Sequence, residues 1–217
     1  MSRVYLLVEG QSEMAFVKKL LQPHYARMAL YIESTLVKTS SEHRGGMPGY
    51  AGIKRQVDHL CKRYKRHAHV STMFDLYALP GDFPGKNSSD WVKQKTGRQK
   101  AELIETCLAE DIFHHNFIPN IMVHEYEALM FVRPRCFLEL GGQKVVDALE
   151  KVRQNTAPED INDSPHTAPS RRILPVMPKY NKILDGSRIA CDTGLDAMRA
   201  DCPHFDAWLR KLEGLAG

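Results

Sequence analysis

The sequence lacks any pattern that would join its cysteines into a disulfide framework or a zinc site. The five cysteines are odd in number and include no Cys-x-x-Cys pair. No apolar run approaches the roughly 18 residues of a membrane-spanning helix, and the apolar stretch near the N-terminus is too short for a signal peptide. We therefore expect a soluble protein with reduced, mostly buried thiols, no membrane association and a cytoplasmic location.

Internal repeats, low-complexity tracts and the Gly-x-x-x-x-Gly-Lys-Ser/Thr loop that cradles ATP phosphates are also absent. The ten histidines do not form the helical i, i+4 pair of zinc enzymes. A net charge of +4 is a small excess, which permits contact with nucleic acid but does not require it. Any ATP hydrolysis linked to this chain must therefore come from another subunit.

The most informative stretch lies at the N-terminus, where an apolar segment changes abruptly into a helix-opening segment. Residues 3–8 are apolar and rich in β-formers, which predicts a buried strand. Gly10 permits a tight turn, and Ser12 is expected to cap the helix that follows. Glu9 then lies at the carboxyl end of a strand, where α/β proteins bind ligands, and Glu13 lies one turn into the helix.

Strand and helix patterns alternate over the first 130 residues or so. Further strands are predicted over residues 30–37, 70–77 and 117–124, and helices over 53–66 and 95–114. This alternation indicates an α/β fold with a mostly parallel central sheet flanked by helices. We expect an α/β core over residues 1–132 and a mainly helical C-terminal extension over residues 133–217, packed on the core as a single globular unit.

Acidic side chains recur where these strands end. They are Glu9 and Glu13 after the first strand, Asp75 and Asp82 around the end of the third, and Glu125 and Glu127 after the fourth. In a parallel sheet all three groups would meet at one edge, and their repulsion would be neutralised most simply by Mg²⁺ or Mn²⁺. The alternative is that they are ordinary solvated residues of loops and first helical turns.

Several motifs carry a resemblance to a known family. They lie at residues 8–13, 74–85, 124–131, 167–172, 178–182 and 202–209. In this order they resemble the DUF4276 family of Toprim-like bacterial proteins. The first motif, Leu-Leu-Val-Glu-Gly-Gln-Ser-Glu, also resembles that of Toprim domains, the Mg²⁺-dependent fold of topoisomerases, primases and the overcoming-lysogenization-defect nucleases.

The resemblance implies metal-dependent phosphodiester chemistry with Glu9 and Asp75 as the catalytic residues. Glu9 would be a general base or a metal ligand, and Asp75 would hold the metal. Toprim domains usually carry Asp-x-Asp, whereas this chain has Asp75-Leu76-Tyr77, so another carboxylate must complete the site. We favour Glu125 over Glu127. The candidate metal ligands are Glu9, Glu13, Asp75, Asp82 and Glu125.

Basic residues near these acids are candidates for phosphate contact. Lys86, Arg171 and Arg172 would bind the charge that develops on a phosphate, and the basic helix over 53–66 would help to line a nucleic-acid path. In the competing interpretation all of them are solvated or paired with acids. The implied partners are nucleic acid, with DNA preferred over RNA, and a separate ATPase; a homo-oligomer is left open.

The leading functional hypothesis is a Mg²⁺- or Mn²⁺-dependent Toprim-like nuclease that acts as a bacterial defence effector. One alternative is a non-catalytic sensor or adaptor that binds metal or nucleotide through a reduced set of acids, which the missing second aspartate favours. Another is a phosphatase or transferase that acts on a small phosphate ester.

Overall fold

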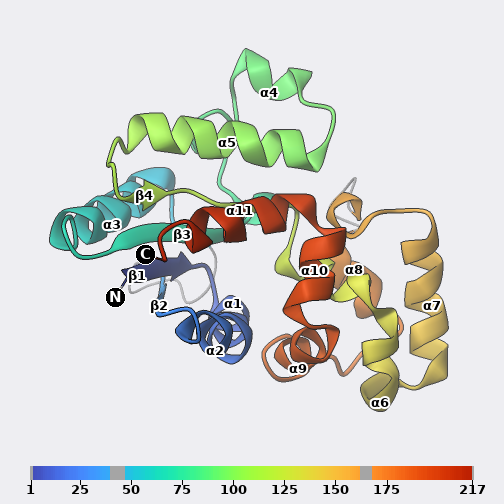
Figure 1. Ribbon diagram of the computed structural model, residues 1–217. Helices are drawn as coiled ribbons and strands as arrows, with labels where there is room; N and C mark the ends of the chain where they lie inside the picture. The colour runs from blue at the N-terminus through green and yellow to red at the C-terminus, as the bar shows by residue number, and fades with distance from the viewer. Residues whose placement is uncertain (1, 40–46, 162–167, 217) are drawn as a thin grey trace.

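The computed structural model describes residues 2–39, 47–161 and 168–216 and has a parallel β-sheet flanked by helices (Figure 1). The strands are β1 (Ser2–Val8), β2 (Leu30–Leu36), β3 (His69–Asp75), β4 (Phe117–Ile118) and β5 (Ile121–Met122). They run in the order β2-β1-β3-β4, with β5 also paired to β3, and every pairing is parallel. The predicted α/β class and parallel sheet are confirmed.

The strands show the burial that their positions in the sheet require. In β1, Leu6 and Leu7 point to opposite faces and are both buried, each in a different hydrophobic cluster. In the edge strand β2, Leu30 is buried and its neighbour Tyr31 is exposed, which gives the alternation of a strand with one solvated face. The sheet therefore has two separate cores, one on each face.

Helices cover both faces of the sheet (Figure 1). On one face lie α1 (Gln11–Phe16), the π-helical segment η1 (Val17–Leu21) and α2 (Gln22–Ala26). On the other lie α3 (Tyr50–Arg63) and α5 (Gly97–Asp111), with the short helix α4 (Ser89–Lys93) before α5. None of the described helices is long and apolar enough to cross a membrane.

The C-terminal half is helical and returns to the sheet. Its 3₁₀ segments are η3 (Tyr126–Val132), η4 (Pro134–Phe137) and η5 (Pro158–Asp160), and another, η2 (Leu76–Ala78), directly follows β3. Its α-helices are α6 (Leu138–Gly141), α7 (Gln143–Gln154), α8 (Pro169–Ile173), α9 (Leu184–Thr193), α10 (Leu195–Asp201) and α11 (Pro203–Glu213).

Helix α11 contacts the sheet directly. The buried Trp208 indole N–H donates to Ser71 Oγ of β3 at 3.0 Å, and the Phe205 ring lies 6.2 Å from that of Phe16. The division at residue 132 falls at the end of η3 and stays a prediction. All five cysteines are free, and Cys61 and Cys202 are buried.

Some local predictions were wrong. Gly10, not Ser12, occupies the N-cap of α1, and the Ser12 hydroxyl donates instead to Glu13. The strand expected over residues 117–124 is interrupted after Ile118, because Pro119 has no N–H to donate to the ladder. The helix expected from residue 95 begins at Gly97, where Thr96 forms a capping box with Gln99.

Candidate functional site

Two of the predicted acids come together because their strands are neighbours. Val8 of β1 pairs with Met73 of β3, so Glu9 and Asp75 emerge side by side at the carboxyl edge of the sheet. The Asp75 side chain is buried, and its backbone N–H donates to the Glu9 carboxylate. Glu9 itself is partly buried and lies in the short turn between β1 and α1.

Glu13 reaches the same place from the first turn of α1. Its side chain is buried, and its Oε1 accepts a hydrogen bond of 3.2 Å from Ser12 Oγ. A Cβ atom at Gly10 would lie 2.9 Å from Glu13 Oε2. A side chain at this position would therefore displace the Glu13 carboxylate from its place in the cluster.

Glu125 and Glu127 complete the cluster from the segment after β5. Glu125 accepts hydrogen bonds from the backbone N–H and the hydroxyl of Ser170, at 2.9 and 3.1 Å. It thereby supplies an acceptor for a backbone N–H in the first turn of α8. Glu127 is fully buried, with Lys182 Nζ 2.8 Å from its Oε1. His124, just before them, has a φ of +69°, which non-glycine residues rarely adopt. Both glutamates are therefore built into the fold, which is the opposite of solvated loop positions.

The electrostatics of the cluster show an excess of negative charge. Burial, followed by the charges of Glu13 and Glu9, raises the pKa of Asp75 well above its usual range. Burial and the Glu13 charge raise the pKa of Glu9 to about 7. Burial also raises the pKa of Glu127 to about 7, although the nearby Lys182 ammonium opposes the shift. Lys182 is one cation against several carboxylates, so their mutual repulsion remains.

The donor set fits a hard divalent cation in chemistry but not yet in geometry. Glu9 Oε2 and Glu127 Oε2 are buried and have no hydrogen-bond partner among the described residues, and carboxylate oxygens are the ligands that Mg²⁺ and Mn²⁺ prefer. Within residues 2–39, 47–161 and 168–216, however, no three His, Cys, Asp or Glu side chains are arranged to hold a metal as they stand. A bound cation would require these side chains to turn toward one another.

Two predicted residues have other contacts. Asp82 is exposed and accepts a hydrogen bond of 2.8 Å from the backbone N–H of Tyr50 at the start of α3. The Lys86 ammonium donates to the Leu79 carbonyl, and burial lowers the pKa of Lys86. Both side chains therefore hold the loop after β3 in shape, and their contacts tie them to this loop and to α3.

Arg171 and Arg172 lie in α8, directly after the Ser170 that binds Glu125. Arg171 is exposed, and Arg172 is partly buried. The start of their motif, at residue 167, lies outside the described residues. Both arginines therefore share a short helix with a residue that contacts the carboxylate of Glu125. A role for them in phosphate binding stays a prediction.

Sequence reasoning missed Lys182 and Ser170 as members of the site. Both fall within motifs that carry the family resemblance, but neither has a spacing that links it to the strands. They reach the site only because α8 and the segment before α9 fold back onto η3, where the Tyr126 hydroxyl donates to the Lys182 carbonyl at 3.0 Å.

The match to a family model agrees with the resemblance drawn from the motifs. No curated protein matches the sequence. Among solved structures, the chain is similar to the C-terminal region of the Xanthomonas campestris pv. campestris OLD protein, with 16% identity over 97% of this chain and 98% of that chain and a TM-score of 0.42. The model of the DUF4276 family, a domain of unknown function, matches residues 8–213. The chain therefore belongs to the DUF4276 family.

Proposed function

We propose that the chain is a Mg²⁺- or Mn²⁺-dependent nuclease that hydrolyses phosphodiester bonds at the carboxyl edge of its sheet. The observation that carries this proposal is the cluster of Glu9, Glu13 and Asp75, joined by Glu125 and Glu127. Four of these side chains are buried and that of Glu9 is partly buried, and the nearby cation Lys182 brings one positive charge against their several negative charges. Carboxylates gathered in this way repel one another unless they are protonated or share a cation.

The two catalytic residues differ in what they can do. Asp75 is buried, and the charges of Glu13, Glu9, Glu127 and Glu125 all act on it, which suits a cation ligand. Glu9, with a pKa of about 7, can accept a proton from a nucleophile near neutral pH and is suited to act as a general base. A bound divalent ion would polarise the scissile phosphate and lower the pKa of a water molecule.

Lys182 is the cation best placed to act on the substrate. Its side chain is 43% exposed, although its ammonium contacts the fully buried Glu127. The side chain is therefore reachable from solvent while its charge lies at the site. In this position it can donate a hydrogen bond to a phosphate oxygen as negative charge develops there. Glu127 then acts as a positioning residue that fixes the ammonium.

The family resemblance extends the proposal to the biological partners. We propose that the substrate is nucleic acid, DNA in preference to RNA, and that the chain works as a bacterial defence effector with a separate ATPase. The sequence supplies no phosphate-binding Gly-x-x-x-x-Gly-Lys-Ser/Thr loop of its own. A partner of this kind would explain how nucleotide hydrolysis could be coupled to cleavage.

One observation favours a second candidate function, a non-catalytic sensor or adaptor. The described carboxylates are gathered but do not form a coordination shell as they stand. A site that needs rearrangement could bind a cation or nucleotide as a signal and do no chemistry. The two candidates differ in whether cation binding is accompanied by cleavage.

Cleavage of labelled DNA and RNA, single-stranded and duplex, tests the proposal in Mg²⁺, in Mn²⁺ and in chelator. The wild type should cleave only with a divalent cation, and Asp75→Asn and Glu9→Gln should each reduce the rate by about 10²-fold or more. Glu110→Gln, which changes an exposed acid on α5, is the matched control and should cleave like wild type. Cleavage in chelator, or full activity of Asp75→Asn, would refute the assignment. Cation binding without cleavage would favour the adaptor.

A further inference from the structure

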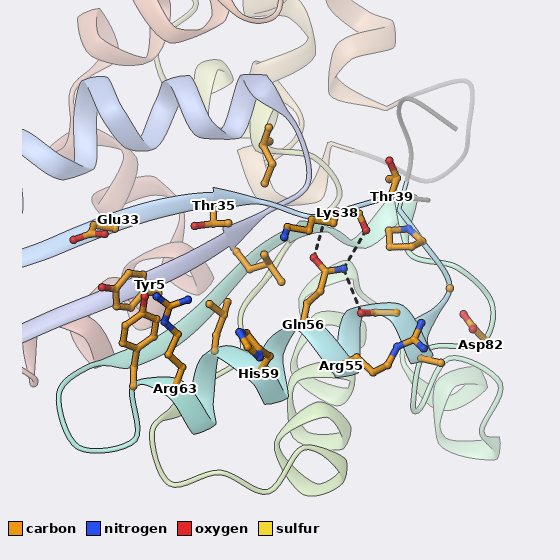
Figure 2. Close-up of a pocket in the computed structure, with 18 residues that line it drawn as sticks. Tyr5, Glu33, Thr35, Lys38, Thr39, Arg55, Gln56, His59, Arg63 and Asp82 are labelled. Atoms are coloured by element: carbon orange, nitrogen blue, oxygen red, sulfur yellow. Dashed lines mark hydrogen bonds between the residues drawn. The ribbon is translucent and has the colours of Figure 1, made fainter. Parts of the chain in front are cut away.

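A hollow lies on the α3 face of the sheet, apart from the carboxylate cluster. It is a cavity of about 970 Å³ between the edge strand β2 and α3 (Figure 2). From α3 the side chains of Arg55, His59 and Arg63 line it, four residues apart and therefore on one face of the helix. Lys38, just after β2, lines it from the opposite wall.

A smaller hollow of about 480 Å³ extends this cavity along α3 toward the N-terminus of β1. The two hollows share Tyr5, Arg63 and Tyr64. The two tyrosine rings are stacked, with centroids 3.8 Å apart and planes 11° apart, and the Arg63 guanidinium lies 5.4 Å from the centre of the Tyr64 ring. Together the hollows form one groove, here called the α3 groove, with an aromatic pair near its middle.

The positive charge of the α3 groove is not neutralised by the protein. Its acids have other contacts, because Glu33 pairs with Arg3 at 3.6 Å and Asp82 accepts from the Tyr50 backbone. Four basic side chains line the groove: Lys38, Arg55, His59 and Arg63. None of them forms an ion pair with an acid in the part of the chain that the structure describes. Lys54, by contrast, lies next to Arg55 and pairs with Asp111 at 2.8 Å. A groove with unpaired cations is suited to bind an anion.

We propose that the α3 groove binds a single strand of nucleic acid. Its shape is elongated, since it follows α3, a helix of 14 residues that spans about 21 Å at 1.5 Å per residue. Cations spaced along one wall can contact successive phosphates, and the partly buried rings of Tyr5 and Tyr64, which line both hollows, offer aromatic surface to bases. A compact anion would use only one end of such a groove.

The groove also leads to the carboxylate cluster, so this inference rests on the proposed nuclease function and names the path of its substrate. Thr39, Gly49 and Asp82 line the end of the groove that lies at the carboxyl edge of the sheet. Leu36, the last residue of β2, pairs with Val8, the residue before Glu9. A strand that left the groove at this end would therefore reach the edge where Glu9 and Asp75 lie.

Binding is measured by fluorescence anisotropy of a labelled oligothymidylate in chelator, so that neither metal nor cleavage contributes. The test variant is Arg55→Ala with Arg63→Ala. The matched control is Lys62→Ala with Arg66→Ala, which removes two exposed cations of the same region that do not line the groove. Circular dichroism should give the wild-type spectrum for both variants, because the four side chains are all exposed.

The groove variant should bind about tenfold more weakly or worse, and the control should stay within about twofold of wild type. The slope of log affinity against log salt concentration should fall by about 1.4 in the groove variant, since each single-strand phosphate contact contributes about 0.7. Equal losses in both variants, no binding by the wild type, or preference for duplex over single-stranded DNA and RNA competitors would overturn the inference. If the strand binds here and no cleavage is found with any cation, the groove stands and the nuclease proposal fails.

Discussion

Replacement of Glu9 by glutamine should stabilise the fold at alkaline pH while it removes function. Glu9 is held beside Glu13 and Asp75, and its pKa is raised from 4.5 to about 7 by burial and by the Glu13 charge. The folded chain therefore holds this proton more tightly than the unfolded chain does. The stability that protonated Glu9 contributes is fully present below about pH 4.5 and is lost as the pH rises through about 7.

The magnitude follows from the two pKa values. Each pH unit between them corresponds to about 1.4 kcal/mol, so ionised Glu9 lowers the free energy of unfolding by up to about 3 kcal/mol at about pH 8. Glutamine keeps the shape and carries no charge. Glu9→Gln should therefore exceed the wild type by up to about 3 kcal/mol at about pH 8 and should nearly equal it at about pH 4.

Urea unfolding in chelator, followed by tryptophan fluorescence, to which the buried Trp208 contributes, and by circular dichroism, measures this difference. Glu110→Gln, on the exposed face of α5, should match the wild type at both pH values. Mn²⁺ at about 1,000 times its dissociation constant should reverse the order, because a ligand of the folded state then adds about 4.1 kcal/mol to the wild type. Equal stability of Glu9→Gln and wild type at about pH 8 would refute the account of a repulsive cluster.

Three further substitutions test other parts of the fold, each by urea unfolding. Lys182→Met leaves the buried Glu127 without its cation and should lower the free energy of unfolding by about 1–2 kcal/mol at about pH 8. The loss should be smaller at about pH 5, where Glu127 is protonated, and an equal loss at both pH values would contradict this. Glu159→Gln weakens the acceptor of the first two N–H groups of α11 and should cost about 1 kcal/mol; an unchanged midpoint would show that the cap is dispensable. Gly97→Ala places a Cβ atom 2.5 Å from the His124 ring and should cost about 1–3 kcal/mol; wild-type stability would mean that the ring moves freely.

The sequence was sufficient to predict the parts of the site that lie directly after strands. The apolar run before Glu9 predicts a strand end, and the strand predicted over residues 70–77 places Asp75 near its end. In the structure β3 ends at Asp75, and the parallel order of β1 and β3 brings the two acids together. The same logic predicts that Glu125 and Glu127 follow a strand, although it cannot choose between them. The structure buries both, because η3 turns one toward α8 and the other toward Lys182.

The remaining features depend on contacts between distant segments, which local patterns do not encode. Lys182 reaches Glu127 only through the return of the C-terminal helices, and Asp82 is drawn to the start of α3 by a backbone donor that its own loop does not reveal. The α3 groove arises in a similar way. The basic helix was recognisable from its periodicity, but which of its cations are paired, as Lys54 is with Asp111, depends on the neighbouring helix.

The central claim, a carboxylate site for a divalent cation, is tested most directly by calorimetric titration of Mn²⁺ into the protein in buffers of different ionisation enthalpy. Because Glu9 and Glu127 have pKa values of about 7, binding at about pH 6 should release more protons than binding at about pH 8. Asp75→Asn should abolish binding, and Glu110→Gln should bind like wild type. The absence of Mn²⁺ binding by the wild type at either pH, or unchanged binding by Asp75→Asn, would contradict the account.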